Sequence, residues 1–156
     1  GIALPHYATQ EEIKAIKSAL PEVNVAIMET RRTAYGNMVL ANDKGALADP
    51  RLTTKDMANI SDAMGVEVVA GEIAGLPYVG SLAIATNKGV LAHPMCSEEE
   101  LQRLKDVLKV PVDVGTINCG IPYVGTGLIA NTHGAVAGYC TTGPEIFIVE
   151  QALDLV

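Results

Sequence analysis

The sequence predicts an α/β repeat domain in which a strand–helix–strand unit of about 44 residues recurs roughly three and a half times. Glycines at positions 1, 45, 89 and 134 lie 44, 44 and 45 residues apart, and each begins a short apolar run. A helix N-cap signature follows eight residues after each of these marker glycines, and an apolar stripe at helical spacing follows the cap. We therefore expect residues 1–156 to form one domain, with units that start at residues 1, 45, 89 and 134.

The first element of each unit is predicted to be a buried strand. Val, Leu, Ile and Ala dominate the run after each marker glycine, which is the composition of strands that are covered on both faces. The four runs read GIALP, GALADP, GVLAHP and GAVAGY.

A helix is predicted next by a capping box. In this pattern the cap side chain accepts a hydrogen bond from a free backbone amide, and an acid three residues later accepts another. The caps are Thr9, Thr53, Ser97 and Thr142, and the acids are Glu12, Asp56, Glu100 and Glu145. Apolar residues at steps of three and four then form one stripe that must be buried. The stripes are Ile13, Ile16 and Leu20; Met57, Ile60 and Met64; Leu101, Leu104 and Leu108; and Ile146, Val149 and Leu153.

Two more strands are expected after each helix. Pro21, Gly65 and Pro111 end or closely follow three of the helices, and alternating valines predict a strand beyond each. After a turn-rich loop, the last strand is expected at residues 38–41, 82–85 and 127–130. The polar turns NDK, TNK and NTH lead to the next marker glycine. Because one unit cannot bury both its helix stripe and its sheet, neighbouring units must pack against each other.

The composition supports a folded core and limits the kinds of partner that the chain can bind. Hydrophobic residues make up 49% and charged residues 19% of the chain, which excludes a disordered protein. The net charge of −7 argues against broad binding to phosphate backbones and favours a basic protein partner. No apolar run has the length of a membrane span. Cys96, Cys119 and Cys140 lack the spacing of a zinc site and indicate reduced thiols in a cytoplasmic protein.

Several short motifs stand in the repeat register: YGN at residues 35–37, the helix starts TQEE, TTKD, SEEE and TGPE, and GTIN at residues 115–118. With these motifs the chain resembles the translation initiation factor six family, the ribosome anti-association factors of archaea and eukaryotes. The resemblance covers essentially all 156 residues. The short loops favour an archaeal member.

This resemblance implies the pentein fold, a pseudo-fivefold α/β propeller of strand–helix–strand units with helices outside and strands around a small channel. Five units need roughly 220 residues, so we expect about 3.5 of the 5 repeats here. We expect the other one and a half units mainly before Gly1, which would make Gly1 a cut edge of the ring.

The resemblance also implies a function. Members bind the large ribosomal subunit on the face that meets the small subunit, anchored on a ribosomal protein of the L-fourteen type beside the sarcin–ricin loop. Bound there as a monomer, such a factor prevents subunit association by steric blocking, in translation initiation and ribosome biogenesis. The acidic net charge of the chain is consistent with binding to a basic ribosomal protein and with limited contact to ribosomal RNA. No cofactor and no metal are expected.

Asn37, Ser81 and Thr126 are the leading candidates for the ribosome-binding site, because each follows a glycine at the same register before the last strand. In a ring, such positions lie together at one end of the axis. The glycines would let a partner's backbone approach closely, and Tyr35 and Gly36 complete the YGN segment with Asn37. For Ser81 and Thr126, a role in capping strands or fixing turns is an equal alternative. The glycines are Gly36, Gly80 and Gly125.

Two further polar positions are candidates of lower rank. Arg31 and Arg32 form the one basic pair in the sequence. They would either meet an RNA phosphate at the edge of the interface or lie in a solvated loop. Asn118 of the GTIN segment is expected to fix a loop through its amide rather than bind a partner.

An enzyme and a non-ribosomal interaction scaffold are the alternative functions. Other pentein proteins, such as arginine deiminases and amidinotransferases, use a Cys nucleophile, a His and carboxylates at the ring centre. The three cysteines would need His93 or His133 as a partner, and a nearby helix cap would stabilise a thiolate at Cys96 or Cys140. The glycine-rich Cys segment and the His-x-Asp/Glu pairing of those enzymes are absent from this sequence. We therefore predict a protein without catalytic residues.

Overall fold

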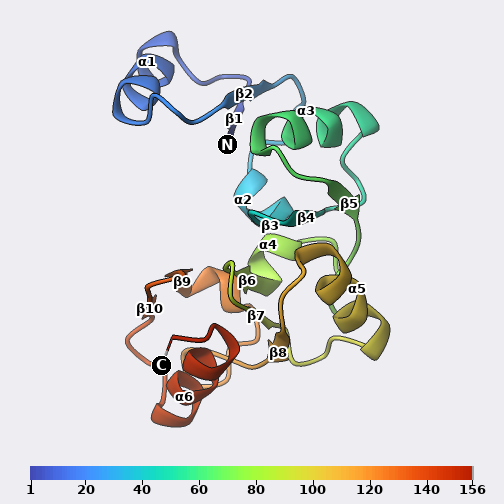
Figure 1. Cartoon of the computed structure of the whole chain (residues 1–156), viewed down its shortest axis with the longest axis vertical. Helices are drawn as coiled ribbons and strands as arrows, with labels where there is room; N and C mark the ends of the chain where they lie inside the picture. The colour runs from blue at the N-terminus through green and yellow to red at the C-terminus, as the bar shows by residue number, and fades with distance from the viewer. Residues whose placement is uncertain (156) are drawn as a thin grey trace.

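The computed structural model describes residues 1–155, and they form a mixed α/β chain that winds in an open arc (Figure 1). The long helices lie along the outer side of the arc. They are α1 (Gln10–Ala19), α3 (Thr54–Met64), α5 (Glu98–Leu108) and α6 (Gly143–Ala152). Two short helices, α2 (Tyr35–Met38) and α4 (Val79–Leu82), lie toward the inner side.

The strands form four small sheets with a recurring topology. One three-stranded sheet contains β3 (Val39–Asn42), β4 (Gly45–Ala48) and β5 (Val68–Ala70), and the other contains β6 (Ala83–Ala85), β7 (Val90–Ala92) and β8 (Val112–Val114). In both sheets the first two strands are antiparallel to each other. The third strand, which follows the helix, pairs in parallel with the second. One two-stranded sheet consists of the parallel strands β1 (Ile2–Pro5) and β2 (Val25–Met28). The other consists of the antiparallel strands β9 (Leu128–Asn131) and β10 (Gly134–Ala137).

Short helical turns precede the last strand of each unit, and the sequence did not predict them. The strands expected at residues 38, 82 and 127 begin one residue later, at 39, 83 and 128. The preceding residues belong to α2, α4 and the 3₁₀ helix η1 (Val124–Thr126). A helix of three or four residues is too short to produce an apolar period, so pattern analysis cannot detect it.

The predicted capping boxes are present at the long helices. At α1, α3 and α5 the cap oxygen accepts the N3 amide and the N3 carboxylate accepts the cap amide. Asp56 performs this role as well as glutamate does, with 3.1 Å between the Thr53 nitrogen and its carboxylate. At α6, Glu145 accepts both the amide and the hydroxyl of Thr142 at 2.8 Å. Gly65 ends α3 in the left-handed conformation, at a φ of 71°.

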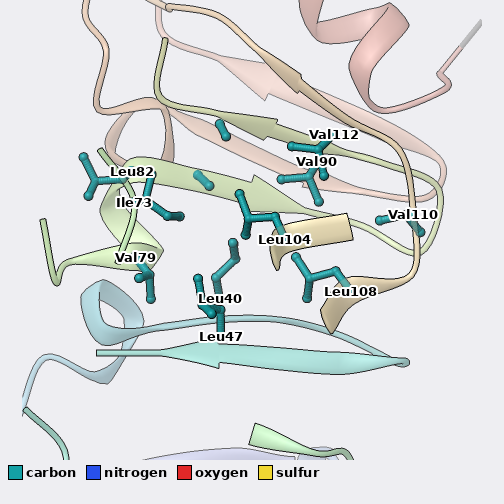
Figure 2. Packing of buried hydrophobic residues seen from close by; sticks show 12 residues of the cluster. Leu40, Leu47, Ile73, Val79, Leu82, Val90, Leu104, Leu108, Val110 and Val112 are labelled. Carbon is teal, nitrogen blue, oxygen red and sulfur yellow. The ribbon is translucent and has the colours of Figure 1, made fainter. Parts of the chain in front are cut away.

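The core is formed between neighbouring units, because each of α3, α5 and α6 covers strands of the preceding unit. In Figure 2, Leu104 and Leu108 of α5 point toward Leu40 and Leu47 on β3 and β4. Val149 of α6 and Leu153, the residue that caps its C-terminus, are buried with Leu91 of β7 in the same way. Ile60 of α3 is buried with Met28 at the end of β2. The stripes predicted on α3 and α5 are confirmed, whereas Ile146 of the α6 stripe is exposed.

The marker glycines allow this packing. A Cβ on Gly1, Gly45 or Gly89 would overlap a carbonyl oxygen in the last turn of the next unit's helix. The three carbonyls belong to Ala63, Val107 and Ala152. The repeated glycine is therefore explained by a close approach between strand and helix, and at Gly134 no described atom lies within 4 Å of such a Cβ.

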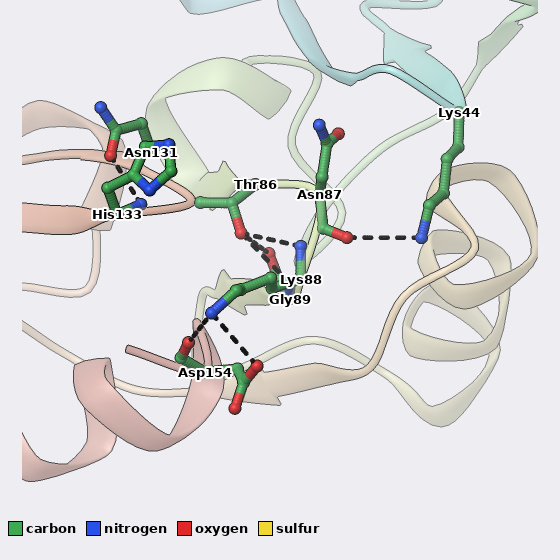
Figure 3. A network of polar contacts seen from close by, with 8 residues as sticks. All are labelled: Lys44, Thr86, Asn87, Lys88, Gly89, Asn131, His133 and Asp154. Carbon is green, nitrogen blue, oxygen red and sulfur yellow. Dashed lines mark hydrogen bonds and ion pairs between the residues drawn. The ribbon is translucent and has the colours of Figure 1, made fainter. Parts of the chain in front are cut away.

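Polar turns join the units at the end of the sheets where the marker glycines lie (Figure 3). Asn42 donates its amide hydrogens to the carbonyl oxygens of Thr86 and Leu108, at 3.1 and 2.9 Å. Lys88 donates to the carbonyl oxygen of Asp154 at 2.8 Å and lies 3.4 Å from its carboxylate. The turn at Asn42 thus holds the next turn and the end of α5, and the turn at Lys88 holds the chain just after α6.

The first helix and the last hairpin differ from this pattern. No residue of α1 is buried, and Leu20 of its predicted stripe is 48% exposed, so the prediction of a buried stripe is wrong for α1. On the last hairpin, Ile129 and Val136 are 77% and 72% exposed. Leu128 on the opposite face of β9 is buried with Val149 and Ala152 of α6, so the hairpin is covered on one face and open on the other. None of the helices in the described part of the chain is long and apolar enough to cross a membrane.

Candidate functional site

The three short turns α2, α4 and η1 stack in a row at one end of the sheets, and we call them the turn row. A Cβ on Gly80 would overlap the Gly36 carbonyl oxygen and would stand 2.7 Å from that of Val39. A Cβ on Gly125 would meet the carbonyl oxygens of Gly80 and Ala83 in the same way. Successive units therefore touch backbone to backbone along the row.

This end of the sheets also gathers the loops that lead into the long helices. Ala48 at the end of β4 pairs with Val39, directly after α2, and Ala92 pairs with Ala83, directly after α4. The loops that follow Ala48 and Ala92 therefore begin beside the turn row. The turn row and these loops form one surface, which we call the Asn37 end.

Asn37, Ser81 and Thr126 occur at equivalent places in the turn row, but their side chains are used differently. Asn37 is exposed, and no hydrogen bond within residues 1–155 engages its side-chain amide. The same holds for the hydroxyl of the half-buried Ser81. The hydroxyl of Thr126 donates to the carbonyl oxygen of Tyr123 at 2.7 Å and so fixes its own turn. Asn37 is the member of the set best placed to contact a partner.

Tyr35 and two of the three glycines serve the fold. Tyr35 is 6% exposed, and its hydroxyl lies 3.3 Å from that of Thr30. Its side chain packs in the core and cannot be reached by a partner. The space that Gly80 and Gly125 leave is filled by the chain's own backbone, so the expectation of a close partner approach is not met there. Gly36 is exposed with no described atom within 4 Å of a Cβ, and that expectation stays a prediction for it.

Arg31 and Arg32 lie directly before the turn row. Arg31 is exposed and Arg32 is half-buried, and neither forms an ion pair within residues 1–155. Arg32 lies close enough to Asp49 to help lower the pKa of that carboxyl. Arg31 and Arg32 therefore bring two positive charges to the segment that leads into α2.

Sequence analysis did not identify a second group of residues at the Asn37 end. Asp49 is fully buried and accepts hydrogen bonds from Arg51, at 2.9 Å from Nε and 2.5 Å from a terminal nitrogen. These bonds lower the pKa of Asp49 despite its burial. The guanidinium carbon of Arg51 also lies 4.6 Å from the ring centroid of Tyr78, which is 45% exposed. The recurrence of PYVG at residues 77–80 and 122–125 was the available signal for this tyrosine.

The next unit repeats the exposed tyrosine with a different neighbour. Tyr123, 43% exposed, meets the buried His93 ring edge to face, with 5.9 Å between the ring centroids. Nδ1 of His93 accepts the amide hydrogen of Met95 at 3.0 Å, and burial lowers the pKa of the imidazole. His93 is thus a neutral structural residue at neutral pH.

Acidic capping residues surround the turn row, because the long helices begin at this end. They lie in the first turns of the helices and are Glu11, Glu12, Asp56, Glu98, Glu99, Glu100 and Glu145. Glu145 accepts hydrogen bonds from the Thr142 and Gly120 amides and from the Thr116 hydroxyl, and these lower its pKa to about 2. Asp56 and Glu145 are buried in this role, and the three glutamates that begin α5 leave exposed or half-buried negative charge at that helix start.

The side chain of Asn118 forms an internal contact, as expected: its amide oxygen accepts a hydrogen bond from the Thr141 hydroxyl at 3.4 Å. Its backbone amide donates to the Thr141 hydroxyl at 3.2 Å, and its side chain fills the space that a Cβ on Gly127 or Gly138 would need. Its φ of 49° lies in the left-handed region, which asparagine tolerates better than most residues do. Asn118 fixes the loop before η1.

The thiols do not form a catalytic arrangement within residues 1–155. Burial raises the pKa of Cys96 to about 11, so the proposed stabilisation of its thiolate is wrong. Cys119 and Cys140 are exposed, and no hydrogen bond among the described residues joins either to His93 or His133. No group of three or more His, Cys, Asp or Glu residues within that range is arranged to hold a metal ion.

The sequence of the chain is similar to those of known proteins along its length. A sequence model described as the eIF-6 family matches residues 1–152. Three archaeal proteins, each named translation initiation factor 6, illustrate the similarity. The Pyrococcus horikoshii protein is 48% identical over 160 aligned residues, which cover 100% of this chain and 70% of that protein. The Aeropyrum pernix protein is 53% identical, with 98% of this chain and 65% of that protein covered. The Nitrosopumilus maritimus protein is also 53% identical, with 97% and 68% covered.

Proposed function

The chain belongs to the eIF-6 family, and from this premise we propose that it binds the large ribosomal subunit through the Asn37 end and keeps the small subunit from joining. The observation that carries the choice of surface is the exposed, unbonded amide of Asn37 on a rigid backbone row. A side chain that its own fold does not use, held on packed backbone, loses little entropy when it binds a partner.

We propose that the partner on the subunit is a basic ribosomal protein of the L-fourteen type, beside the sarcin–ricin loop. The acidic helix starts around the turn row support a partner of positive charge, and the net charge of −7 supports it for the whole chain. Arg31 and Arg32 are the exception at this end, and we assign them to a limited contact with a phosphate of ribosomal RNA.

The mechanism that we propose is steric. A rigid domain seated on the joining face of the large subunit excludes the small subunit without any chemical step. We further propose that the units belong to a pentein ring and that the factor acts as a monomer in the cytoplasm, in translation initiation and ribosome biogenesis. The packing of each of α3, α5 and α6 on the preceding sheet supports a ring, because the same head-to-tail interface recurs from unit to unit.

Subunit joining is the direct test of this function. Purified archaeal ribosomal subunits are mixed with and without the chain, and the products are separated on a sucrose gradient. We expect the chain to migrate with the large subunit and to lower the fraction of joined ribosomes. Normal joining with the chain bound elsewhere on the ribosome would contradict the steric mechanism, and no binding to the large subunit would contradict the function.

A further inference from the structure

We propose that Tyr78 is an anchor of the binding surface, held in place by Arg51, and that Tyr123 extends the same surface into the next unit. This inference rests on the proposed function. Tyr78 was not among the binding residues predicted from the sequence. We propose that it recognises basic side chains of the partner protein.

Tyr78 is placed beside Asn37 by the backbone of the turn row. It is the N-cap residue of α4, two residues before Gly80, which sits against the carbonyl oxygen of Gly36. Asn37 follows Gly36 directly. A partner that covers the Asn37 amide therefore lies next to the Tyr78 ring.

The ring is exposed yet fixed. Tyr78 is 45% exposed, and the guanidinium carbon of Arg51 stands 4.6 Å from its ring centroid. A terminal nitrogen of Arg51 lies 3.4 Å from the Tyr78 hydroxyl. Arg51 is itself tied to the fully buried carboxylate of Asp49. Because this chain of contacts starts in the core, the tyrosine is ordered before any partner arrives, which lowers the entropy cost of binding.

The core does not need this aromatic residue. The apolar position of α4 is filled by Val79, which is fully buried, and Tyr78 lies outside that cluster. The first unit has the small Ala34 at the equivalent N-cap of α2, so the turn itself does not require a ring. Two of the three turns nevertheless display a tyrosine at this place, Tyr78 and Tyr123, at 45% and 43% exposure.

The surroundings fit a basic partner. Asp49 pairs with Arg51 and so offsets the positive charge that Arg51 brings to the Tyr78 ring. The face of a tyrosine ring attracts lysine and arginine side chains and packs against their methylene stems. Tyrosine and arginine are also the residues that most often dominate the binding energy of protein interfaces.

The test compares affinities of variants for purified large subunits. Tyr78→Ala is expected to weaken binding by about tenfold or more, whereas Tyr78→Phe, which keeps the ring, stays within about threefold of the original chain. Phe147→Ala is the matched control, since Phe147 is an aromatic residue 61% exposed on the outer helix α6, and it should bind normally. Thermal unfolding of each variant verifies that the fold is intact.

Arg51 is tested by a double variant, because its proposed role is to position the Tyr78 ring. Arg51→Ala should weaken binding in the original chain but have no further effect once Tyr78→Ala is present. An additional loss in the double variant would overturn the positioning role. Full affinity in Tyr78→Ala, while Asn37→Arg abolishes binding, would overturn the anchor and leave the proposed function standing. No binding by the unaltered chain would overturn both.

Discussion

The α-carbon of Gly80 sits so close to the carbonyl oxygen of Gly36 that no side chain fits between the two turns that contain them. The contact joins the unit that presents Asn37 to the unit that presents Tyr78. The geometry of the whole Asn37 end therefore depends on a glycine that touches no partner.

Replacement of this glycine tests the contact. Gly80→Ala is expected to destabilise the chain by about 1–3 kcal/mol, because the new methyl group would overlap backbone atoms that cannot rotate away. The measurement is urea unfolding followed by circular dichroism. Gly36→Ala is the matched control at the same register: no described atom lies within 4 Å of its Cβ, and we expect a change within about 0.5 kcal/mol. Equal effects at the two positions would contradict the stacking of the row.

The inter-unit core gives a second prediction, with a pair of identical residues. Ile60 is fully buried between α3 and the preceding sheet, and Ile16 occupies the equivalent position on α1, where no residue is buried. Ile60→Ala should cost about 2–5 kcal/mol of unfolding free energy. Ile16→Ala should cost less than about 1 kcal/mol, because little apolar surface is lost. A large effect at Ile16 would contradict the exposure of α1.

The pairs Gly36 and Gly80, and Ile16 and Ile60, also show which features of the structure can be predicted from the sequence. Its periodicity identified Ile16 and Ile60 as equivalent, and it located the capping boxes and strands to within a residue or two. Burial, however, depends on whether a neighbouring sheet covers the helix, which local periodicity cannot report. In the same way, the repeat marked Gly80 but could not tell that the chain's own backbone, rather than a partner, fills the space beside it.

The candidate site was predicted in part for a related reason. Asn37 was found from its register, because a repeated position is visible in the sequence itself. Arg51 and Tyr78 are 27 residues apart, and their contact depends on how the loop after β4 returns to α4. Tyr35 was misjudged because YGN gives no sign of which side chain points inward.

The carboxylate of Glu145 predicts a pH dependence of stability. Its pKa of about 2 in the folded chain lies below the ordinary value of 4.5, because amides and hydroxyls donate to the charged form. Its contribution is complete above about pH 4.5 and is lost as the pH falls from there toward 2. Glu145→Gln should therefore lower stability by about 1–3 kcal/mol at pH 7 and flatten the acid limb of the stability curve.

Glu150 provides the control for this measurement on the same helix. Its side chain forms no hydrogen bond within residues 1–155, so Glu150→Gln should leave both the stability at pH 7 and the acid limb nearly unchanged. Denaturant midpoints between pH 2 and pH 7 decide the comparison. An acid limb that is equally steep with and without Glu145 would contradict the role given to its hydrogen bonds.

Thiol reactivity provides a fourth prediction. With a pKa of about 11, roughly one in a thousand Cys96 thiols is ionised at pH 8, so its alkylation should be slow. Cys119 and Cys140 are exposed and should react first, as mass spectrometry of labelled peptides would reveal. Preferential labelling of Cys96 would contradict its burial and would return it to the candidates for a nucleophile.

Binding of the Asn37 end to the ribosome is the central claim, and cosedimentation of the chain with purified large subunits tests it most directly. Asn37→Arg should abolish cosedimentation without unfolding the chain, since Asn37 is exposed and its amide supports no internal hydrogen bond among the described residues. Gln151→Arg, the same change of an exposed amide on the outer helix α6, should cosediment normally. Undiminished cosedimentation of a folded Asn37→Arg chain would contradict the account.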